Sequence, residues 1–353
     1  MGEIAFGASV FALADGAAVV LRERGGAFAE RARATLDAPA VAVASAGASF
    51  VALSTSGRVS VVDAATGEIT RTADGGAGAE LLAAASDGAF VAAGPQGVAL
   101  VAASADGAPM MMDLRGATAL SLSPGLLAIG GKDGTLRVLD TRAASALGAC
   151  RVGGVVRGLA RASRAYWVAS TEHAIVRVER EAGEAFVIVD AKELDLGELT
   201  CDPEVALVAV RVGLHRVALF DLLEGKLRGT LRYEAPVTGV AFAPREAGDT
   251  SCLLGVALGG GAFDVVSITT RDGGVAASDG GGEGIAGVAV EIRLKSPEIA
   301  AIAARARAGE EPPLALRQRP ADASAAPLPT RAAIFWMMAF TAIVLILIWL
   351  LRF

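Results

Sequence analysis

Apolar and polar side chains alternate along a short segment, Leu136 to Asp140, in which leucine, arginine, valine and leucine precede an aspartate. Alternation with a period of two predicts a β-strand, because successive side chains on a strand face opposite sides. Asp133-Gly134 stands just before it and is typical of a hairpin turn, since glycine tolerates the positive φ that such turns need. Comparable strands are predicted to begin at Val19, Val59, Val98, Leu136, Val176, Val217 and Phe263.

These seven strands recur at a nearly constant interval, with steps of 40, 39, 38, 40, 41 and 46 residues. An acidic residue ends four of them, at Glu23, Asp63, Asp140 and Asp221. A unit of about 40 residues with about four short strands is the signature of a propeller blade, and a single blade cannot bury both of its faces. The pattern therefore predicts an all-β chain folded as a seven-bladed β-propeller.

At these residues the chain resembles the WD40 and related β-propeller families. The longest similar segment runs from Arg216 to Pro244, and Phe220-Asp221 occupies in it the place of the Trp-Asp pair of those repeats. Asp133 to Asp140 and Val59 to Glu68 are further partial matches. The resemblance covers about residues 1–295 and implies a propeller over that range.

The chain also departs from the WD40 pattern. No repeat carries the Trp-Asp pair, and neither His173 nor His215 follows a glycine. The side-chain tetrad that braces each WD40 blade is therefore expected to be missing. Quinoprotein-like propellers, whose repeats also contain a Thr-Gly turn such as Thr66-Gly67, stay open as the alternative subfamily.

The limits of the blades follow from the repeats. The seven blades are predicted to end near Leu36, Gly76, Gly116, Gly154, Leu194, Ala235 and Gly282. The stretch from Gly284 to Leu294 is expected to pair with the short first blade and close the ring, since an open propeller would expose two long sheet edges. The propeller is thus expected to occupy residues 1–295.

Beyond the repeats the composition changes. Residues 296–331 begin with a helix-start signal, Ser296-Pro297-Glu298, and continue as a proline-rich juxtamembrane linker. Residues 332–351 are twenty residues without a charge, enough to cross about 30 Å of hydrocarbon as a transmembrane helix. Trp336 and Trp349 lie near its ends as interfacial anchors, and Arg331 and Arg352 flank it.

The charges beside this segment predict its orientation. Seven basic and four acidic residues lie between Arg293 and Arg331, whereas only Arg352 and Phe353 follow the segment. Because positive residues concentrate on the cytoplasmic side, the propeller is expected to face the cytoplasm on a C-terminal anchor. The N-terminus lacks the basic segment of a signal peptide, and the Ala, Gly and Arg bias favours a bacterial inner membrane.

Candidate chemistry is sparse. The string Gly282-x-Gly284-x-x-Gly287 opens a predicted strand and not a helix, so it lacks the helix dipole of a dinucleotide site. His173 and His215 fall in predicted turns, and no metal or nucleotide motif is present, so we expect no catalytic residue, metal site or cofactor. Cys150, Cys201 and Cys252 are an odd number of thiols in separate repeats, which favours a reducing compartment.

Charge is unevenly distributed along the repeats. Lys132 to Arg180 holds nine basic and four acidic residues, whereas residues 1–292 together carry 24 basic and 34 acidic ones. Arginine, tyrosine and tryptophan dominate interface hot spots. The candidate partner-binding residues in this basic sector are Arg157, Arg161, Arg164, Tyr166 and Trp167. The alternative is a solvated face with Tyr166 and Trp167 in the blade core.

The function expected from the sequence is that of a membrane-tethered, WD40-like scaffold for protein–protein interaction, with an unidentified protein partner. The alternative is a propeller enzyme or small-molecule binder, quinoprotein-like or hydrolytic, with its site at the central channel. A third possibility is a structural subunit whose tail helix packs inside a membrane complex. Nucleic acid is not an expected partner, because the repeats are acidic in total and aromatic residues do not alternate with the basic ones.

Overall fold

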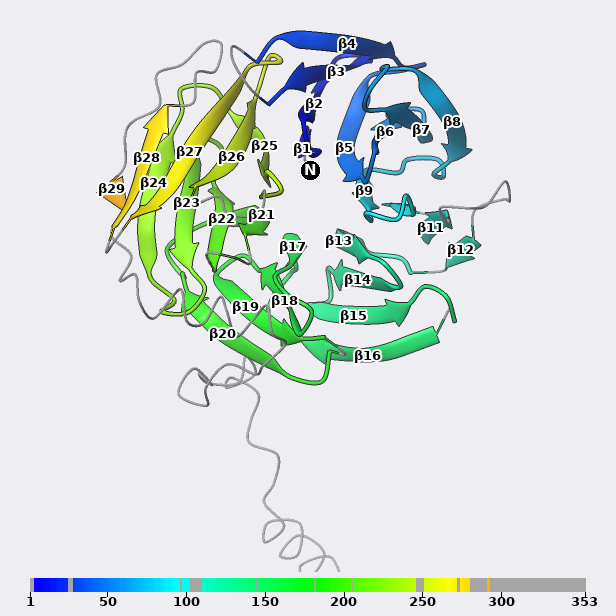
Figure 1. Ribbon diagram of the computed structural model, residues 1–353. Coiled ribbons are helices and arrows are strands. Elements are labelled where there is room, and N and C mark those ends of the chain that lie inside the picture. The colour runs from blue at the N-terminus through cyan, green and yellow to red at the C-terminus, as the bar shows by residue number, and fades with distance from the viewer. Residues whose placement is uncertain are drawn as a thin grey trace, which may run out of the picture.

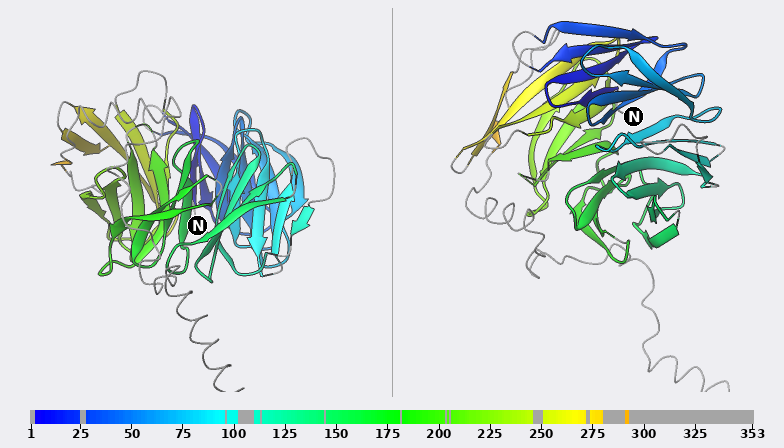
Figure 2. Two further views of the ribbon diagram at one scale, coloured as in Figure 1. Left: turned by 90° about the horizontal axis from the view of Figure 1, so that it is seen from below. Right: turned by 45° about the vertical axis from the view of Figure 1, so that its right-hand side comes forward.

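In the computed structural model, seven sheets follow one another in chain order around a central axis (Figure 1). The structure describes residues 3–24, 28–95, 97–101, 110–112, 114–143, 145–180, 182–202, 204, 206–245, 251–271, 274–279 and 291–292. Seen from the side, the sheets stand next to each other as the blades of a disc (Figure 2). The prediction of an all-β, seven-bladed propeller is confirmed.

Each blade is a meander of consecutive antiparallel strands. Blade one comprises β1 (Ile4–Phe6), β2 (Val10–Asp15), β3 (Ala18–Glu23) and β4 (Glu30–Thr35). Blade two comprises β5 (Ala40–Ala46), β6 (Ser49–Ser54), β7 (Arg58–Asp63) and β8 (Ile69–Asp74). Blade three comprises β9 (Leu81–Ala84), β10 (Phe90–Gly94), β11 (Gly97–Val101) and β12 (Met110–Met112). Blade four comprises β13 (Ala117–Ser123), β14 (Leu126–Gly131), β15 (Thr135–Asp140) and β16 (Ser145–Arg151).

The remaining three blades complete the ring, and the last of them has five strands. Blade five comprises β17 (Gly158–Arg161), β18 (Tyr166–Ser170), β19 (Ala174–Glu179) and β20 (Ala185–Asp190). Blade six comprises β21 (Leu196–Asp202), β22 (Leu207–Val212), β23 (Arg216–Asp221) and β24 (Leu227–Arg232). Blade seven comprises β25 (Val237–Phe242), β26 (Ser251–Leu258), β27 (Phe263–Arg271), β28 (Gly274–Asp279) and β29 (Glu291–Ile292).

The seven strands predicted from alternation are the third strands of the blades, β3, β7, β11, β15, β19, β23 and β27. Burial follows the alternation: Leu136 and Val138 of β15 are fully buried and belong to one apolar cluster with Trp167 of blade five. In β15 the period of two therefore arises because the buried side of the strand packs on the next blade. β23 instead packs on both neighbours, with Val217 and Leu219 against blade seven and Ala218 and Phe220 against blade five.

Three of the four acidic residues that end these strands hold the turns that follow. The Oδ1 atom of Asp140 accepts hydrogen bonds from the backbone N–H groups of Arg142 and Ala143, at 2.8 and 2.9 Å. Asp63 and Asp221 bind the two equivalent N–H groups of their own turns. Backbone hydrogen bonds lower the pKa of Asp140 and of Asp63, as expected for carboxylates that accept N–H donors. In blades two, four and six the acid is thus a turn cap.

The ring closes by side-chain packing between blades one and seven. β1 contacts both β25 and β26, and an aromatic cluster fills the seam. The ring centroids of Phe11 lie 5.3 Å from Phe6, 5.9 Å from Phe28 and 5.5 Å from Phe263. These separations are typical of favourable aromatic pairs, so the four rings stabilise the closure beyond the area that they bury.

The expected pairing of Gly284 to Leu294 with blade one is wrong. The described part of that stretch is β29, which pairs with β28 as the fifth strand of blade seven (Figure 1). Blade one already has its own four hydrogen-bonded strands, β1 to β4, so its closure needs no strand from the C-terminal side.

The predicted linker and transmembrane helix, residues 296–331 and 332–351, lie outside the described residues, as do Arg331, Trp336, Trp349 and Arg352. Within the described ranges, no helix has the length and apolar character needed to cross a membrane.

Candidate functional site

Four adjoining loops form a continuous surface on one face of blades five and six. They are the turn Thr171–His173, the connection Ala191–Asp195, the turn Gly213–His215 and the connection Tyr233–Pro236. We call this surface the blade five–six face. It lies at the end of the blades where each connection leads to the next blade, and polar residues such as His173, Lys192, Glu193 and His215 are exposed on it.

Backbone hydrogen bonds join each of these loops to the next. Ala191 N–H donates to His173 O at 2.7 Å, and Gly213 N–H donates to Asp195 O at 2.9 Å. Tyr233 N–H then donates to His215 O at 2.9 Å. The four loops therefore hold one another in place and form a rigid surface.

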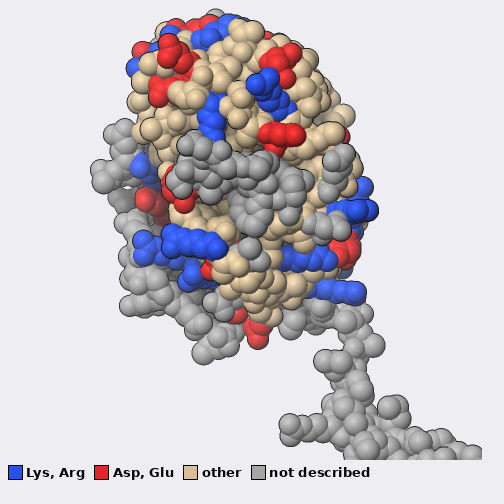
Figure 3. Space-filling model, turned by 90° about the vertical axis from the view of Figure 1, so that its right-hand side faces the viewer, with Lys and Arg blue, Asp and Glu red and all other residues tan. Residues whose placement is uncertain are grey.

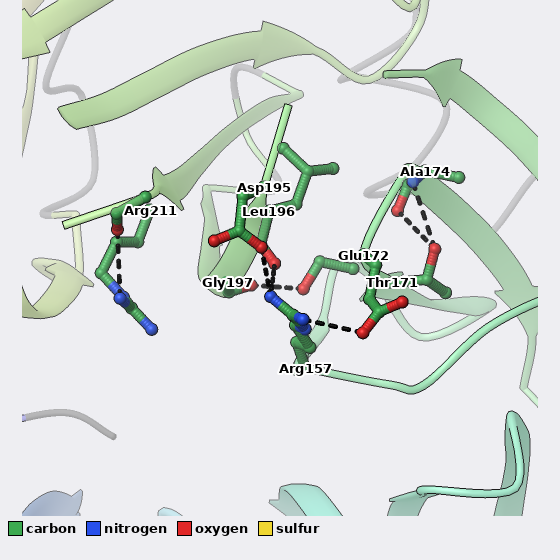
Figure 4. A network of polar contacts seen from close by, with 10 residues as sticks. Arg157, Thr171, Glu172, Ala174, Asp195, Leu196, Gly197 and Arg211 are labelled. Atoms are coloured by element: carbon green, nitrogen blue, oxygen red, sulfur yellow. Dashed lines mark hydrogen bonds and ion pairs between the residues drawn. The ribbon is translucent and has the colours of Figure 1, made fainter. Parts of the chain in front are cut away.

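Arg157 adds a side-chain bond between blades five and six (Figure 4). Arg157 precedes β17 in the chain, and its guanidinium forms ion pairs with Glu172, at 2.7 Å, and with Asp195. Burial disfavours the charge of Arg157, but the bonds to Glu172 and Asp195 outweigh it and raise the pKa of the guanidinium. A side chain placed in this way fixes the turn of blade five to the connection that enters blade six.

Leu214 is the apolar feature of this face. Its side chain lies in the turn between β22 and β23 and is 61% exposed, the most exposed of the large apolar residues in the described part of the chain. Val237 N–H donates to Leu214 O at 2.6 Å, so the residue is held from the neighbouring connection. Exposed Pro236 lies in that connection. The apolar side chain of Leu214 is thus exposed to solvent at a fixed position, and polar residues surround it.

The inner strands of blades three to six line a small cavity on the central channel. Its volume is about 170 Å³, and Leu82, Thr118, Leu159, Glu198 and Leu199 are among its lining residues, with Arg157 at its edge. Sites for small organic molecules are usually about 300–1,000 Å³. The cavity has room for a few water molecules or a small ion, and it gives no support to a larger ligand.

No group of three or more His, Cys, Asp or Glu side chains is placed to hold a metal ion among the residues that the structure places. His173 and His215 are exposed turn residues, as predicted.

Trp167 and Arg161, two of the predicted partner-binding residues, make contacts within the ring. Trp167 is 1% exposed in the core between blades four and five, and its Nε1–H donates to Arg180 O at 3.2 Å. Arg161 lies over the indole, 5.5 Å from the ring centroid, and bonds Ser123 of blade four. Burial lowers the pKa of Arg161, and Arg180 and Arg164 lower it further. Trp167 therefore cannot contact a partner protein that binds the folded ring.

The structure does not bring the five predicted residues together. Arg157 precedes β17, whereas Arg161 ends that strand and Arg164 lies in the turn beyond it, so Arg157 is on the opposite face of the disc from Arg164. Tyr166 packs half-buried against the core of blades five and six, where burial raises its pKa to about 12. Partner binding by Arg157, Arg161 and Arg164 stays a prediction.

All three cysteines are free thiols. Burial raises the pKa of both Cys201 and Cys252 to about 12, and only the thiolate is nucleophilic. Cys201 donates its S–H to Arg161 O at 3.2 Å, which joins blades five and six. These two thiols therefore act in packing.

At pH 8 the folded protein is expected to react with iodoacetamide at Cys150, on the outer strand β16, and not at Cys252, which is 1% exposed. Mass spectrometry of the alkylated peptides checks this, with urea-unfolded protein as the control in which all three react.

Because the pKa of Cys252 rises from 9.0 to about 12 on folding, its contribution to stability is complete below pH 9. That contribution falls between pH 9 and 12, as the unfolded state loses its proton first. Rapid labelling of Cys252 in folded protein would contradict this account.

Leu214 is not among the partner-binding residues predicted from the sequence, all of which are charged or aromatic. The sequence does contain a signal for Leu214, since Gly213-Leu214-His215 places a large apolar residue in a turn between two strands, where polar residues are usual.

Comparison with known proteins shows a shared fold. No protein-family model matches the chain, and no curated protein matches it in sequence. The WD40 domain of Toxoplasma gondii coronin is similar over 77% of this chain and 82% of its own, with a TM-score of 0.61 and 16% identity. A chain of the mitotic checkpoint complex is similar over 75% and 89%, with a TM-score of 0.62 and 11% identity. The β-propeller domain of Myceliophteria thermophila Cps50 (Swd1) is similar over 75% and 96%, with a TM-score of 0.62 and 12% identity. The chain is a seven-bladed β-propeller with the fold of WD40 domains.

Proposed function

We propose that the ring is a protein-interaction platform and that its protein partner binds the blade five–six face. The observation that carries the proposal is Leu214, 61% exposed on a turn that hydrogen bonds hold on both sides. One of the similar propellers is itself a chain of a protein assembly, the mitotic checkpoint complex, which supports a binding role by analogy of fold.

An apolar centre within a polar rim is the usual anatomy of a protein–protein interface. Burying a leucine side chain contributes about 1.5–3 kcal/mol. Little ordering cost opposes this gain, because the clamped loops are already in place before the partner arrives. The proposal needs no catalytic group and no cofactor.

We further propose that a C-terminal transmembrane helix at residues 332–351 holds the ring at the cytoplasmic face of a membrane, a bacterial inner membrane. The support comes from the sequence: an uncharged segment, Trp336 and Trp349 near its ends, and an excess of basic residues before it. The proline-rich linker at 296–331 would set the distance between ring and membrane. Fractionation of the full chain and of a chain ending at residue 331 tests this, since only the full chain should stay with carbonate-washed membranes.

Leu214→Asp is expected to weaken partner binding about thirtyfold, which corresponds to about 2 kcal/mol of lost apolar burial. Affinity capture from detergent extracts identifies the stoichiometric partner, and titration of that partner measures the change in Kd. The free energy of unfolding should change by less than about 0.5 kcal/mol, because the residue is on the surface.

Ile69→Asp is the matched control, because Ile69 is also an exposed apolar residue, 38% exposed, on the outer strand of blade two. It should leave the Kd unchanged. Equal binding by the Leu214→Asp variant and the parent chain, or a monomeric chain that turns over a metabolite, would rule out the proposed function.

A further inference from the structure

The outer strand of blade four is both uncharged over most of its length and exposed to solvent. β16, with the sequence SALGACR, is the longest outer strand in the described part of the chain, and five of its seven residues are exposed. Its first six residues carry no charge, whereas β4, β8 and β24 contain charged residues within the strand. The outer strand β20 also carries no charge before its last residue, Asp190, but Asp190 is its only exposed residue. Proteins usually protect a sheet edge with charges or prolines, because an uncovered edge can pair with another strand.

Cations stand at both ends of this uncharged strand. Arg142 lies in the turn before β16 and Arg151 is its last residue, and both side chains are exposed. Neither forms an ion pair with any residue in the described ranges. Asp133 pairs with Arg137 at 2.7 Å. Asp140 caps its turn, and the charge of Arg142 helps to lower its pKa, but the two side chains form no ion pair. On the side of the disc that carries blades two to four, blue side chains gather over the lower part, where blade four lies (Figure 3).

This charge pattern distinguishes between two strands that could pair with β16, namely β16 of a second copy and an acidic strand of another protein. A second copy of the chain paired through β16 would bring Arg142 and Arg151 of both copies together, which like-charge repulsion opposes. A strand with acidic side chains meets complementary charge at both ends.

The ring itself shows that a blade accepts an additional strand, since β29 pairs with β28 in blade seven. A β-bulge interrupts β16 opposite Val138 and Leu139. Bulges at the same place occur in blades one, two and six, so the bulge does not distinguish β16 from the other edges. The combination of missing charge and solvent exposure does distinguish it from β4, β8, β20 and β24.

We propose that β16 is a docking edge for an extended acidic peptide of a partner protein, which adds to blade four as a fifth strand. Main-chain hydrogen bonds to β16 supply binding that does not depend on sequence, and Arg142 and Arg151 select carboxylates near the ends of the peptide. The site lies on the rim of the disc and is independent of the blade five–six face.

Fluorescence anisotropy on the full chain in detergent tests the proposal with a labelled short peptide of alternating threonine and valine that has glutamate at each end. The peptide is expected to bind, and the double variant Arg142→Glu and Arg151→Glu should weaken binding about tenfold or more, since both charge contacts become repulsive. The control Arg31→Glu changes an exposed arginine on the outer strand of blade one and should leave binding unchanged.

A second peptide separates strand addition from simple charge attraction. N-methylation at alternate residues removes the N–H groups of one edge and keeps both glutamates, so binding should be lost. Equal binding of the methylated peptide, binding that survives the double charge reversal, or no binding of the first peptide would overturn the proposal. Dimerisation of the chain that the double variant abolishes would also overturn it, because the occupant would then be a second copy.

Discussion

Asp202→Ala is expected to lower the free energy of unfolding by about 3–5 kcal/mol. Asp202 ends β21 in blade six, and its Oδ2 lies 2.7 Å from Arg245 Nε, which follows β25 in blade seven. The two side chains are 3% and 7% exposed. Burial opposes the charge of Arg245, yet Asp202 raises the pKa of this guanidinium. Without the carboxylate, a buried cation would lose its partner, and this is the costly half of a buried ion pair.

Urea denaturation followed by tryptophan fluorescence measures the change. Asp133→Ala is the matched control, because Asp133 and Arg137 form an ion pair of the same length, 2.7 Å, with exposed side chains. That variant should cost less than about 1 kcal/mol. The double variant Asp202→Leu with Arg245→Met should recover most of the loss, since an apolar pair of similar volume needs no compensation. A single variant as stable as the parent chain would show that the pair does not join blades six and seven.

Gly255→Val is expected to cost about 2–3 kcal/mol by opening the seam between blades one and seven. Gly255 lies in β26, and β1 packs directly on it. A Cβ atom at this position would lie 2.6 Å from Ile4 Cδ1 and would also collide with the ring of Phe6. Both residues belong to the apolar cluster that contains Phe11, Phe28 and Phe263. A valine would therefore push the first strand away from the last blade.

Limited proteolysis and the urea midpoint together test this expectation, since an opened seam exposes the apolar faces of both blades to solvent. Gly183→Val is the control, because Gly183 lies in a surface turn where an added Cβ has only Glu179 Oε2, at 3.5 Å, in reach. Its midpoint should match that of the parent chain. Unchanged stability and protease resistance in the Gly255→Val variant would contradict closure by packing at this seam.

The regular part of the fold follows from the sequence because every blade repeats the same local pattern. In blade four the third strand alternates where one side packs on the next blade, as Leu136 and Val138 do. An aspartate caps the turn that follows this strand, as in blades two and six. Both signals are local, so a single chain is enough to detect them.

The contacts between blades join residues about one repeat apart, which ties the period of the sequence to the geometry of the ring. Arg157 and Asp195 are 38 residues apart, as are Arg161 and Ser123, and Cys201 and Arg161 are 40 apart. The period predicts which segments meet. It does not predict which residue types meet there, because ion pairs, hydroxyls and thiols serve equally in these positions.

The candidate site was predicted less well, for a physical reason. Arg157 and Arg161 are neighbours in sequence, but β17 carries them to opposite faces of the disc. Clustering along the chain therefore does not imply clustering in space on a strand that spans the ring. The local sequence places Leu214 in a turn, but the mutual clamping of the four loops depends on backbone contacts between different repeats, which no local pattern reveals.

Cross-linking of the captured complex with a short amine-reactive reagent tests the proposed platform most directly. Lys192 lies on the blade five–six face and Lys226 at the opposite end of blade six, and their side chains are 80% and 69% exposed. The two amines thus offer nearly equal chemical access in the free ring. We expect the partner to be linked through Lys192 and not through Lys226; links through Lys226 alone would place the partner on the other face and contradict the account.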